Sequence, residues 1–304
     1  MSVPASRDGT KPDDYGAVVA LTGVASLAER FDGFILDQWG VVHDGTRPYP
    51  GAAECLRALR ARGKRVVMLS NSGRREAYNV ELMRRMGFER ALFDRFVSAG
   101  EEARQAIVER ADDFHRRLGR RCFVFARNGD RSVLEGIGLE FTDRIEDADF
   151  LAVVGCDAPR RTLADYELEL QAGIAHRLPM LCANPDLWRP SENGLVEAAG
   201  MLAQRYETLG GSVFYHGKPH APIYASCLAA LQCPRERVVA IGDSLEHDVL
   251  GAHRVSLPSA LVASGVHARE LAIEWGEWPA ADRFSGLIDA APAVPQFLVR
   301  AFVW

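Results

Sequence analysis

The chain has 304 residues, of which 48% are hydrophobic and 25% charged, and its formal net charge is −5. That length suffices for two modest domains, and the absence of a basic block of about five residues argues against nucleic acid or an anionic membrane as the main partner. No apolar stretch approaches the roughly 18 residues of a membrane-spanning helix. Residues 1–14 lack the apolar core of a secretion signal. We therefore expect a soluble, cytoplasmic protein.

Short apolar runs alternate with helical patterns from residue 34 onwards. Gly63 and Gly87 stand where the first two predicted helices should end. This rhythm predicts an α/β fold with a parallel sheet and right-handed crossovers. The predicted elements of this first stretch are strands at 34–37, 65–69 and 96–99, and helices at 52–62 and 76–86.

A second rhythm begins near residue 101 and predicts a separate small α/β unit. Its elements are helices at 101–118 and 162–176, and strands at 122–125, 150–154 and 180–183. The first pattern then resumes. The predicted elements there are helices at 221–231 and from 248, and strands at 238–241 and 260–263.

Asp37 directly follows the apolar run Phe34-Ile35-Leu36. A carboxylate in this position lies at the carboxyl end of a buried strand, where open α/β sheets build their active sites. Such a carboxylate can attack phosphorus and form an aspartyl-phosphate. The alternative is a carboxylate that caps a turn.

Ser70 and Asn71 follow the next predicted strand. A hydroxyl and backbone N–H groups at a strand-to-helix turn can hold phosphate oxygens, although Ser and Asn are also ordinary helix N-caps. Lys218 stands in His216-Gly217-Lys218-Pro219 before a predicted helix. It is either a fixed cation that neutralises phosphoryl charge or a solvated surface lysine.

Asp243 and Asp248 lie on the loop that follows the strand Val238–Ile241. Two carboxylates in such a loop suit Mg²⁺, which prefers oxygen ligands and keeps several waters. Asp243 is the expected ligand, whereas Asp248 and Ser244 are expected in the outer shell. The alternative is a capped helix start.

The order and placement of these segments resemble the haloacid dehalogenase (HAD) superfamily, and more narrowly its subfamily IIA. That subfamily includes nucleotide-monophosphate, para-nitrophenyl phosphate and pyridoxal phosphate phosphatases. The resemblance covers about residues 20 to 265. The segments that carry it are Asp37–Gly40, Gly45 with Pro50-Gly51-Ala52, Leu69–Ser72, Asn184-Pro185-Asp186-Leu187, Gly217-Lys218-Pro219 and Gly242–Asp248.

The resemblance implies a Rossmann-like core with an inserted α/β cap of the C2 type. The core would comprise residues 16–100 and 184–304, and the cap residues 101–183. Residues 1–15 are expected to be flexible.

The resemblance also implies roles for individual residues. Asp37 would be the nucleophile, with Lys218 stabilising phosphoryl charge. The remaining implied groups are Ser70 and Asn71 for phosphate; Asp37, Asp243 and the carbonyl of Trp39 for Mg²⁺; and Trp39, His43 and Asp186 for the substrate cleft.

Trp39 departs from the family pattern, which has a second aspartate at this position. That aspartate protonates the leaving group and then activates water, a kind of help typically worth roughly 10²–10⁴ in rate. An indole N–H is a donor that does not titrate. His43 and Asp44, on the same loop, are the candidates for a substitute acid–base group.

Three hypotheses follow from this departure. The preferred one is Mg²⁺-dependent hydrolysis of a small phosphorylated metabolite, a sugar phosphate or nucleotide-like compound, made slow or narrow by Trp39. The alternatives are a HAD phosphotransferase and a non-catalytic sensor of a phosphorylated ligand. A cap would exclude polymeric substrates. Aromatic residues near the C-terminus pack on the core or form a homodimer surface.

Overall fold

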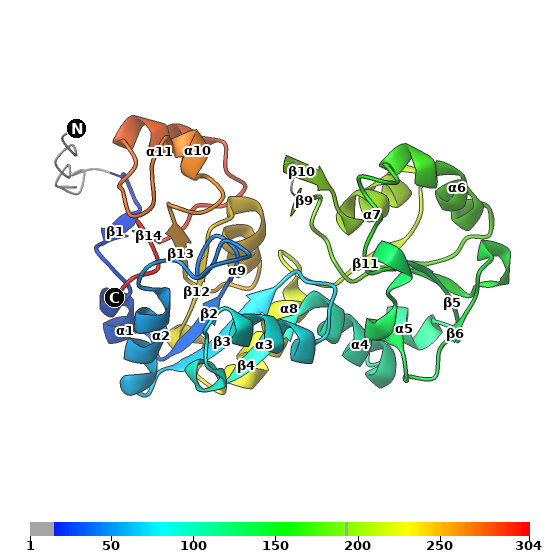
Figure 1. Ribbon diagram of the computed structural model, residues 1–304, viewed down its shortest axis with the longest axis horizontal. Helices are drawn as coiled ribbons and strands as arrows, with labels where there is room; N and C mark the ends of the chain where they lie inside the picture. Colours follow the sequence, from blue (N-terminus) through cyan, green and yellow to red (C-terminus); the bar gives the residue numbers. More distant parts are fainter. Residues whose placement is uncertain (1–14, 192–193) are drawn as a thin grey trace. The chain divides into compact units, whose positions relative to one another are not determined.

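The computed structural model describes residues 15–191 and 194–304 (Figure 1). Contacts divide the chain into two compact units. The first runs to Leu69 and includes Met83–Arg95 and Cys227–Trp304, and the second comprises Ser70–Leu82 and Phe96–Ser226. The domain boundaries expected from the sequence stay a prediction. Of the segment expected to be flexible, residues 1–14 lie outside the described residues, and the Tyr15 ring packs edge-on against Phe284.

The first unit contains a parallel sheet in the order β1-β14-β13-β12-β2-β3. Apolar strands buried on both faces are typical of such sheets, and every residue of β2 and β12 is buried. The predicted α/β fold with a parallel sheet is therefore confirmed. The strands are β1 (Val19–Leu21), β2 (Gly33–Leu36), β3 (Arg65–Ser70), β12 (Val238–Gly242), β13 (Ser259–Val262) and β14 (Phe297–Val299).

Helices and short helical turns complete the first unit. In α2 the side chains of Ala52, Leu56 and Leu59 are fully buried, as its apolar stripe predicts. The chain passes from one unit to the other four times: after Leu69, within α3, after Arg95 and within α8. The elements are α1 (Ala25–Arg30), α2 (Ala52–Ala61), α3 (Glu76–Arg85), η1 (Arg90–Leu92), α8 (Ala221–Leu231), η6 (Arg235–Arg237), the π-helical turn η7 (Leu245–Val249), α9 (Leu250–Arg254), α10 (Ala268–Leu271) and α11 (Ala281–Asp289).

The second unit contains a five-stranded parallel sheet in the order β11-β8-β7-β5-β6, and an antiparallel pair, β9 and β10. Its strands are β4 (Arg95–Ser98), β5 (Arg121–Phe125), β6 (Glu140–Phe141), β7 (Phe150–Val153), β8 (Met180–Cys182), β9 (Trp188–Ser191), β10 (Gly194–Glu197) and β11 (Val213–Tyr215). Its helices and turns are α4 (Ala99–Glu109), α5 (Asp113–Arg117), η2 (Arg127–Gly129), η3 (Ser132–Leu134), η4 (Ile145–Asp147), η5 (Leu163–Tyr166), α6 (Glu167–Ala175) and α7 (Ala199–Thr208).

The helix expected over residues 101–118 is two helices in the structure. Arg110 adopts a left-handed conformation, with φ of 50°, and ends α4. The side chain of Asp112 then accepts a hydrogen bond from the backbone N–H of His115 and begins α5. This break changes the direction of the chain ahead of His115.

No helix within residues 15–191 and 194–304 has both the length and the apolar character needed to cross a membrane.

Candidate active site

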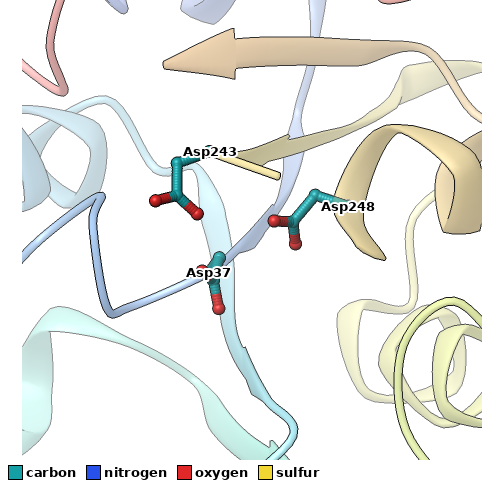
Figure 2. Close-up of side chains that lie close together, drawn as sticks. All are labelled: Asp37, Asp243 and Asp248. Atoms are coloured by element: carbon teal, nitrogen blue, oxygen red, sulfur yellow. The ribbon is translucent and has the colours of Figure 1, made fainter. Parts of the chain in front are cut away.

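Three carboxylates meet at the carboxyl end of the first sheet (Figure 2). Asp37 follows β2, Asp243 follows β12, and Asp248 lies in η7. Strands β2 and β12 pair directly, and the N–H of Asp37 extends their ladder by donating to the Ile241 carbonyl over 2.9 Å. One carboxylate oxygen from each aspartate lies within 4.8 Å of the other two. From the sequence, Asp248 was expected in the outer shell of the metal. In the structure its carboxylate lies together with those of Asp37 and Asp243.

Three glycines create the space that the carboxylates occupy. A Cβ atom on Gly40, whose φ is +82°, would lie 1.8 Å from Asp243 Oδ2. A Cβ atom on Gly242 would lie 2.0 Å from Asp248 Cγ, and one on Gly265 would lie 2.1 Å from Asp243 Cβ. No side chain fits at these distances. Sequence reasoning missed this role, because only Gly242 adjoins one of the three aspartates in the sequence.

Backbone N–H groups orient two of the carboxylates. Asp243 Oδ2 accepts from Val266 N at 2.7 Å, and Asp248 Oδ2 accepts from Ser244 N at 3.1 Å. Ser244 Oγ accepts in turn from His247 N and caps η7. Crowded carboxylates repel one another, and their oxygens are the ligands that Mg²⁺ and Ca²⁺ prefer. The donor set therefore fits a hard divalent cation.

Trp39 lies on the loop that follows β2, and 41% of its surface is exposed. Its backbone forms an isolated bridge with His43. A Cβ atom on Gly45 would lie 3.2 Å from the indole Nε1, so this glycine lets the loop pass close to the ring. Within the first unit the indole is a partly exposed surface rather than a core side chain.

His43 is 6% exposed, and burial lowers the pKa of its imidazole to about 4. Its Nδ1 accepts from Gly45 N at 2.9 Å, so the ring is neutral with its proton on Nε2. Hydrogen bonds from the backbone of Arg47 and Thr46, and from the Thr46 hydroxyl, hold the pKa of Asp44 below its ordinary value. A general acid works best with a pKa near the working pH. Neither group meets that requirement.

In the second unit, the Asn71 side chain joins Asp186 and Lys218. Asn71 Nδ2 donates to Asp186 Oδ1 at 2.8 Å and to the Lys218 carbonyl at 3.1 Å, and its Oδ1 accepts from Lys218 N at 2.6 Å. Both amide hydrogens are thus committed within the protein. The Asn71 side chain therefore holds the Lys218 segment, and its expected phosphate-binding role stays a prediction.

Ser70 directly precedes Asn71 in the chain, whereas Lys218 is 147 positions away and meets it through the main-chain hydrogen bonds. Lys218 is 4% exposed, so its position is fixed by the packing around it. Ser70 Oγ accepts from Ser72 N at 3.2 Å, which shapes the turn that follows β3. The structure thus brings together Asn71, Lys218 and Asp186 in the second unit, and Asp37, Asp243 and Asp248 in the first.

Comparisons with known proteins match these features. A family model described as haloacid dehalogenase-like hydrolase matches residues 34–140, and one described as HAD-hydrolase-like matches residues 215–289. Chronophin of Rattus norvegicus is 30% identical over 256 residues, which is 78% of each chain. Ribonucleotide monophosphatase NagD of Escherichia coli (strain K12) is 27% identical, over 76% of this chain and 87% of the relative. The crystal structure of a haloacid dehalogenase-like hydrolase from Brucella suis 1330 has a TM-score of 0.78 and 28% identity, and covers 93% of this chain and 100% of its own.

Proposed function

This chain belongs to subfamily IIA of the haloacid dehalogenase superfamily and is a hydrolase of that family, and we propose that it removes the phosphoryl group from a small metabolite with the help of Mg²⁺. The cluster of Asp37, Asp243 and Asp248 carries this proposal, because it joins a potential nucleophile to two further oxygen ligands at the end of a rigid sheet. Relatives whose names describe phosphatases support the same reaction.

In the proposed reaction, Asp37 attacks phosphorus in line with the leaving oxygen. An O–P bond forms to the Asp37 carboxylate while the bond to the leaving oxygen breaks, and water later cleaves the aspartyl-phosphate. Lys218, Ser70 and the N–H of Asn71 would bind the phosphoryl oxygens. Mg²⁺ held by Asp37, Asp243, Asp248 and the Trp39 carbonyl would supply positive charge against the developing anion.

The loop after β2 lacks a side chain suited to protonating the leaving group. Trp39 cannot supply a proton, His43 is buried and neutral, and Asp44 is held as a carboxylate by its turn. We therefore expect slow turnover of ordinary sugar phosphates and nucleoside monophosphates, whose alkoxide leaving groups need protonation. Substrates that release a stable anion, such as aryl, enol or acyl phosphates, should react faster.

The same observation favours a second candidate, phosphoryl transfer. Without a base to activate water, the aspartyl-phosphate would persist long enough for another acceptor to take the group. This candidate predicts that turnover rises when alcohols or amines are added. The hydrolase proposal predicts no such rise.

The test is phosphate release from a panel of small phosphorylated compounds with Mg²⁺. Asp37→Asn should lower kcat/KM by at least about 1,000-fold, because loss of a covalent nucleophile removes the reaction path. The matched control is Asp289→Asn, at the exposed end of α11, which should change activity less than about twofold. Retained activity in Asp37→Asn would exclude the nucleophile role. A phosphorylated compound that stabilises the chain without turning over would favour the sensor.

A further inference from the structure

Four titratable side chains form a hydrogen-bonded line within the second unit. Glu102 in α4 contacts His216, which follows β11, with 2.5 Å between Oε2 and Nδ1. The Nε2 atoms of His216 and His115 are 3.1 Å apart. His115 Nδ1 lies 2.7 Å from Oδ2 of Asp112, the cap of α5. Both imidazoles are fully buried, whereas the Asp112 side chain is 48% exposed.

The three hydrogen bonds require three protons. Two neutral imidazoles carry one N–H each and two carboxylates carry none, so the ordinary neutral-pH forms supply two. The complete line therefore holds one additional proton. Charge balance favours this, because one added proton offsets one of two carboxylate charges close to buried rings.

The surroundings locate the additional proton. Burial lowers the pKa of His115, which favours the neutral form of this ring. Its one N–H serves Asp112, which leaves its Nε2 as the acceptor for His216 Nε2–H. The third proton then lies between His216 Nδ1 and Glu102. The rings of Phe114 and Phe214 pack against His115, and the titratable groups facing the imidazole pair come from α4 and α5.

His216 is tightly coupled to Lys218. One residue, Gly217, separates them, and its φ is +102°. A Cβ atom on Gly217 would lie 2.7 Å from Asn71 Oδ1, 2.8 Å from Pro185 Cδ and 3.0 Å from Ala99 Cβ. This enclosed glycine leaves little freedom to absorb a shift of His216. A change in the imidazole pair is therefore passed to the Lys218 main chain and its bonds with Asn71.

We propose that His216 is a positioning residue for Lys218, and that the proton it shares with Glu102 keeps the Lys218 segment in place. The assignment of a phosphoryl-binding role to Lys218 rests on the proposed function. The line is complete while the third proton is bound. As pH rises and that proton leaves, two protons remain for three hydrogen bonds, so His216 loses its bond either to Glu102 or to His115, and the segment loosens.

The first test needs no substrate. Nitrogen-15 NMR of the full chain between pH 5 and 9 should show one imidazole with both nitrogens protonated, which loses a proton as pH rises. The amide of Lys218 should shift with the same midpoint. Glu102→Gln keeps an acceptor for His216 but removes the charge, and should lower that midpoint by about one pH unit or more. Glu109→Gln, an exposed glutamate on the same helix, should leave it unchanged.

The second test uses a substrate identified by the phosphate-release panel. Glu102→Gln should lower kcat roughly tenfold or more, because small misplacements of a charge-stabilising group are costly. Its alkaline loss of kcat should move down in pH with the NMR midpoint. A role confined to folding would lower the melting temperature and leave the pH profile in place.

Three outcomes would overturn the proposal. Both imidazoles could remain neutral across the pH range, or the Lys218 amide could fail to follow the imidazole titration. The purified chain could instead carry one Zn²⁺ per molecule that His115→Gln removes, which would make the pair a metal site. If the panel yields no turnover, the proposed function fails while the NMR titration still decides whether the shared proton exists.

Discussion

The two ends of the parallel sheet in the first unit carry different arrangements of charge. At the amino end, Asp32 precedes β2 and accepts from Lys64 Nζ, just before β3, and from Arg237 Nε, just before β12, at 2.8 Å each. At the carboxyl end, Asp37 follows β2, and Asp243 and Asp248 follow β12, with oxygens of all three within 4.8 Å of one another. One end pairs opposite charges, and the other crowds like charges.

Asp32 therefore stabilises the fold slightly, whereas the three crowded aspartates at the carboxyl end destabilise it. The side chain of Asp32 is 45% exposed, and such ion pairs contribute little, typically below about 1 kcal/mol each. The carboxyl-end aspartates repel one another at a position fixed by strand register and by glycines. A structure keeps such an arrangement where a cation or a reaction uses it.

The largest effect should come from Gly40→Ala, which acts on the crowded end. The new Cβ would lie 1.8 Å from Asp243 Oδ2, so that carboxylate must move. We expect Mg²⁺-dependent activity to fall at least about 100-fold, and Mg²⁺ titration followed by calorimetry should show weakened binding. Gly276→Ala is the matched control. Gly276 has the same φ of +82°, and a Cβ atom added there would meet no other atom within 4 Å. Equal losses in both variants would attribute the effect to backbone strain.

An intermediate effect should come from Trp39→Asp, which restores a titratable group to the crowded end. We expect hydrolysis of poor leaving groups to rise roughly 10- to 100-fold, and that of activated aryl phosphates to change little. The measurement is the dependence of kcat/KM on leaving-group pKa across substituted aryl and alkyl phosphates. Trp39→Asn is the control, because asparagine is similar in size to aspartate but has no titratable proton. A steep dependence retained in Trp39→Asp would show that Trp39 does not limit proton transfer.

The smallest effect should come from Asp32→Asn at the paired end. Hydrogen bonds from Arg237 and Lys64 lower the pKa of Asp32 to about 2, so its stabilisation is present above its unfolded pKa and is lost as pH falls through about 2. We expect a loss of no more than about 1 kcal/mol at pH 7, with unchanged kcat/KM. Urea unfolding at pH 7 and pH 3 measures it. A larger loss at pH 3 than at pH 7 would contradict this sign.

The sequence predicted those parts of the candidate site that lie directly at the ends of strands. Apolar runs ending in Asp37 and Asp243 predicted two loops of a parallel sheet, and the order of the segments indicated the family. The roles of the glycines were missed, because the closeness of Gly40 to Asp243 is a contact across 203 positions that composition does not reveal.

Side-chain partners in the second unit were also beyond sequence reasoning. Glu102 and His216 are 114 residues apart, and their contact is a tertiary one that no local pattern indicates. The one weak local signal was that His216 lies two residues before Lys218. Asn71 was expected to bind phosphate, and nothing local indicated that its side chain would hold Lys218 and Asp186.

Trp39 also gives the first unit an optical property. Indole emission responds to the polarity and charge around the ring, and this ring is 41% exposed on the loop that carries Asp37. The chain has four other tryptophans, which Trp39→Phe would leave as a constant background. We therefore expect the emission of Trp39 to change when a cation or a phosphorylated compound binds at the carboxylate cluster.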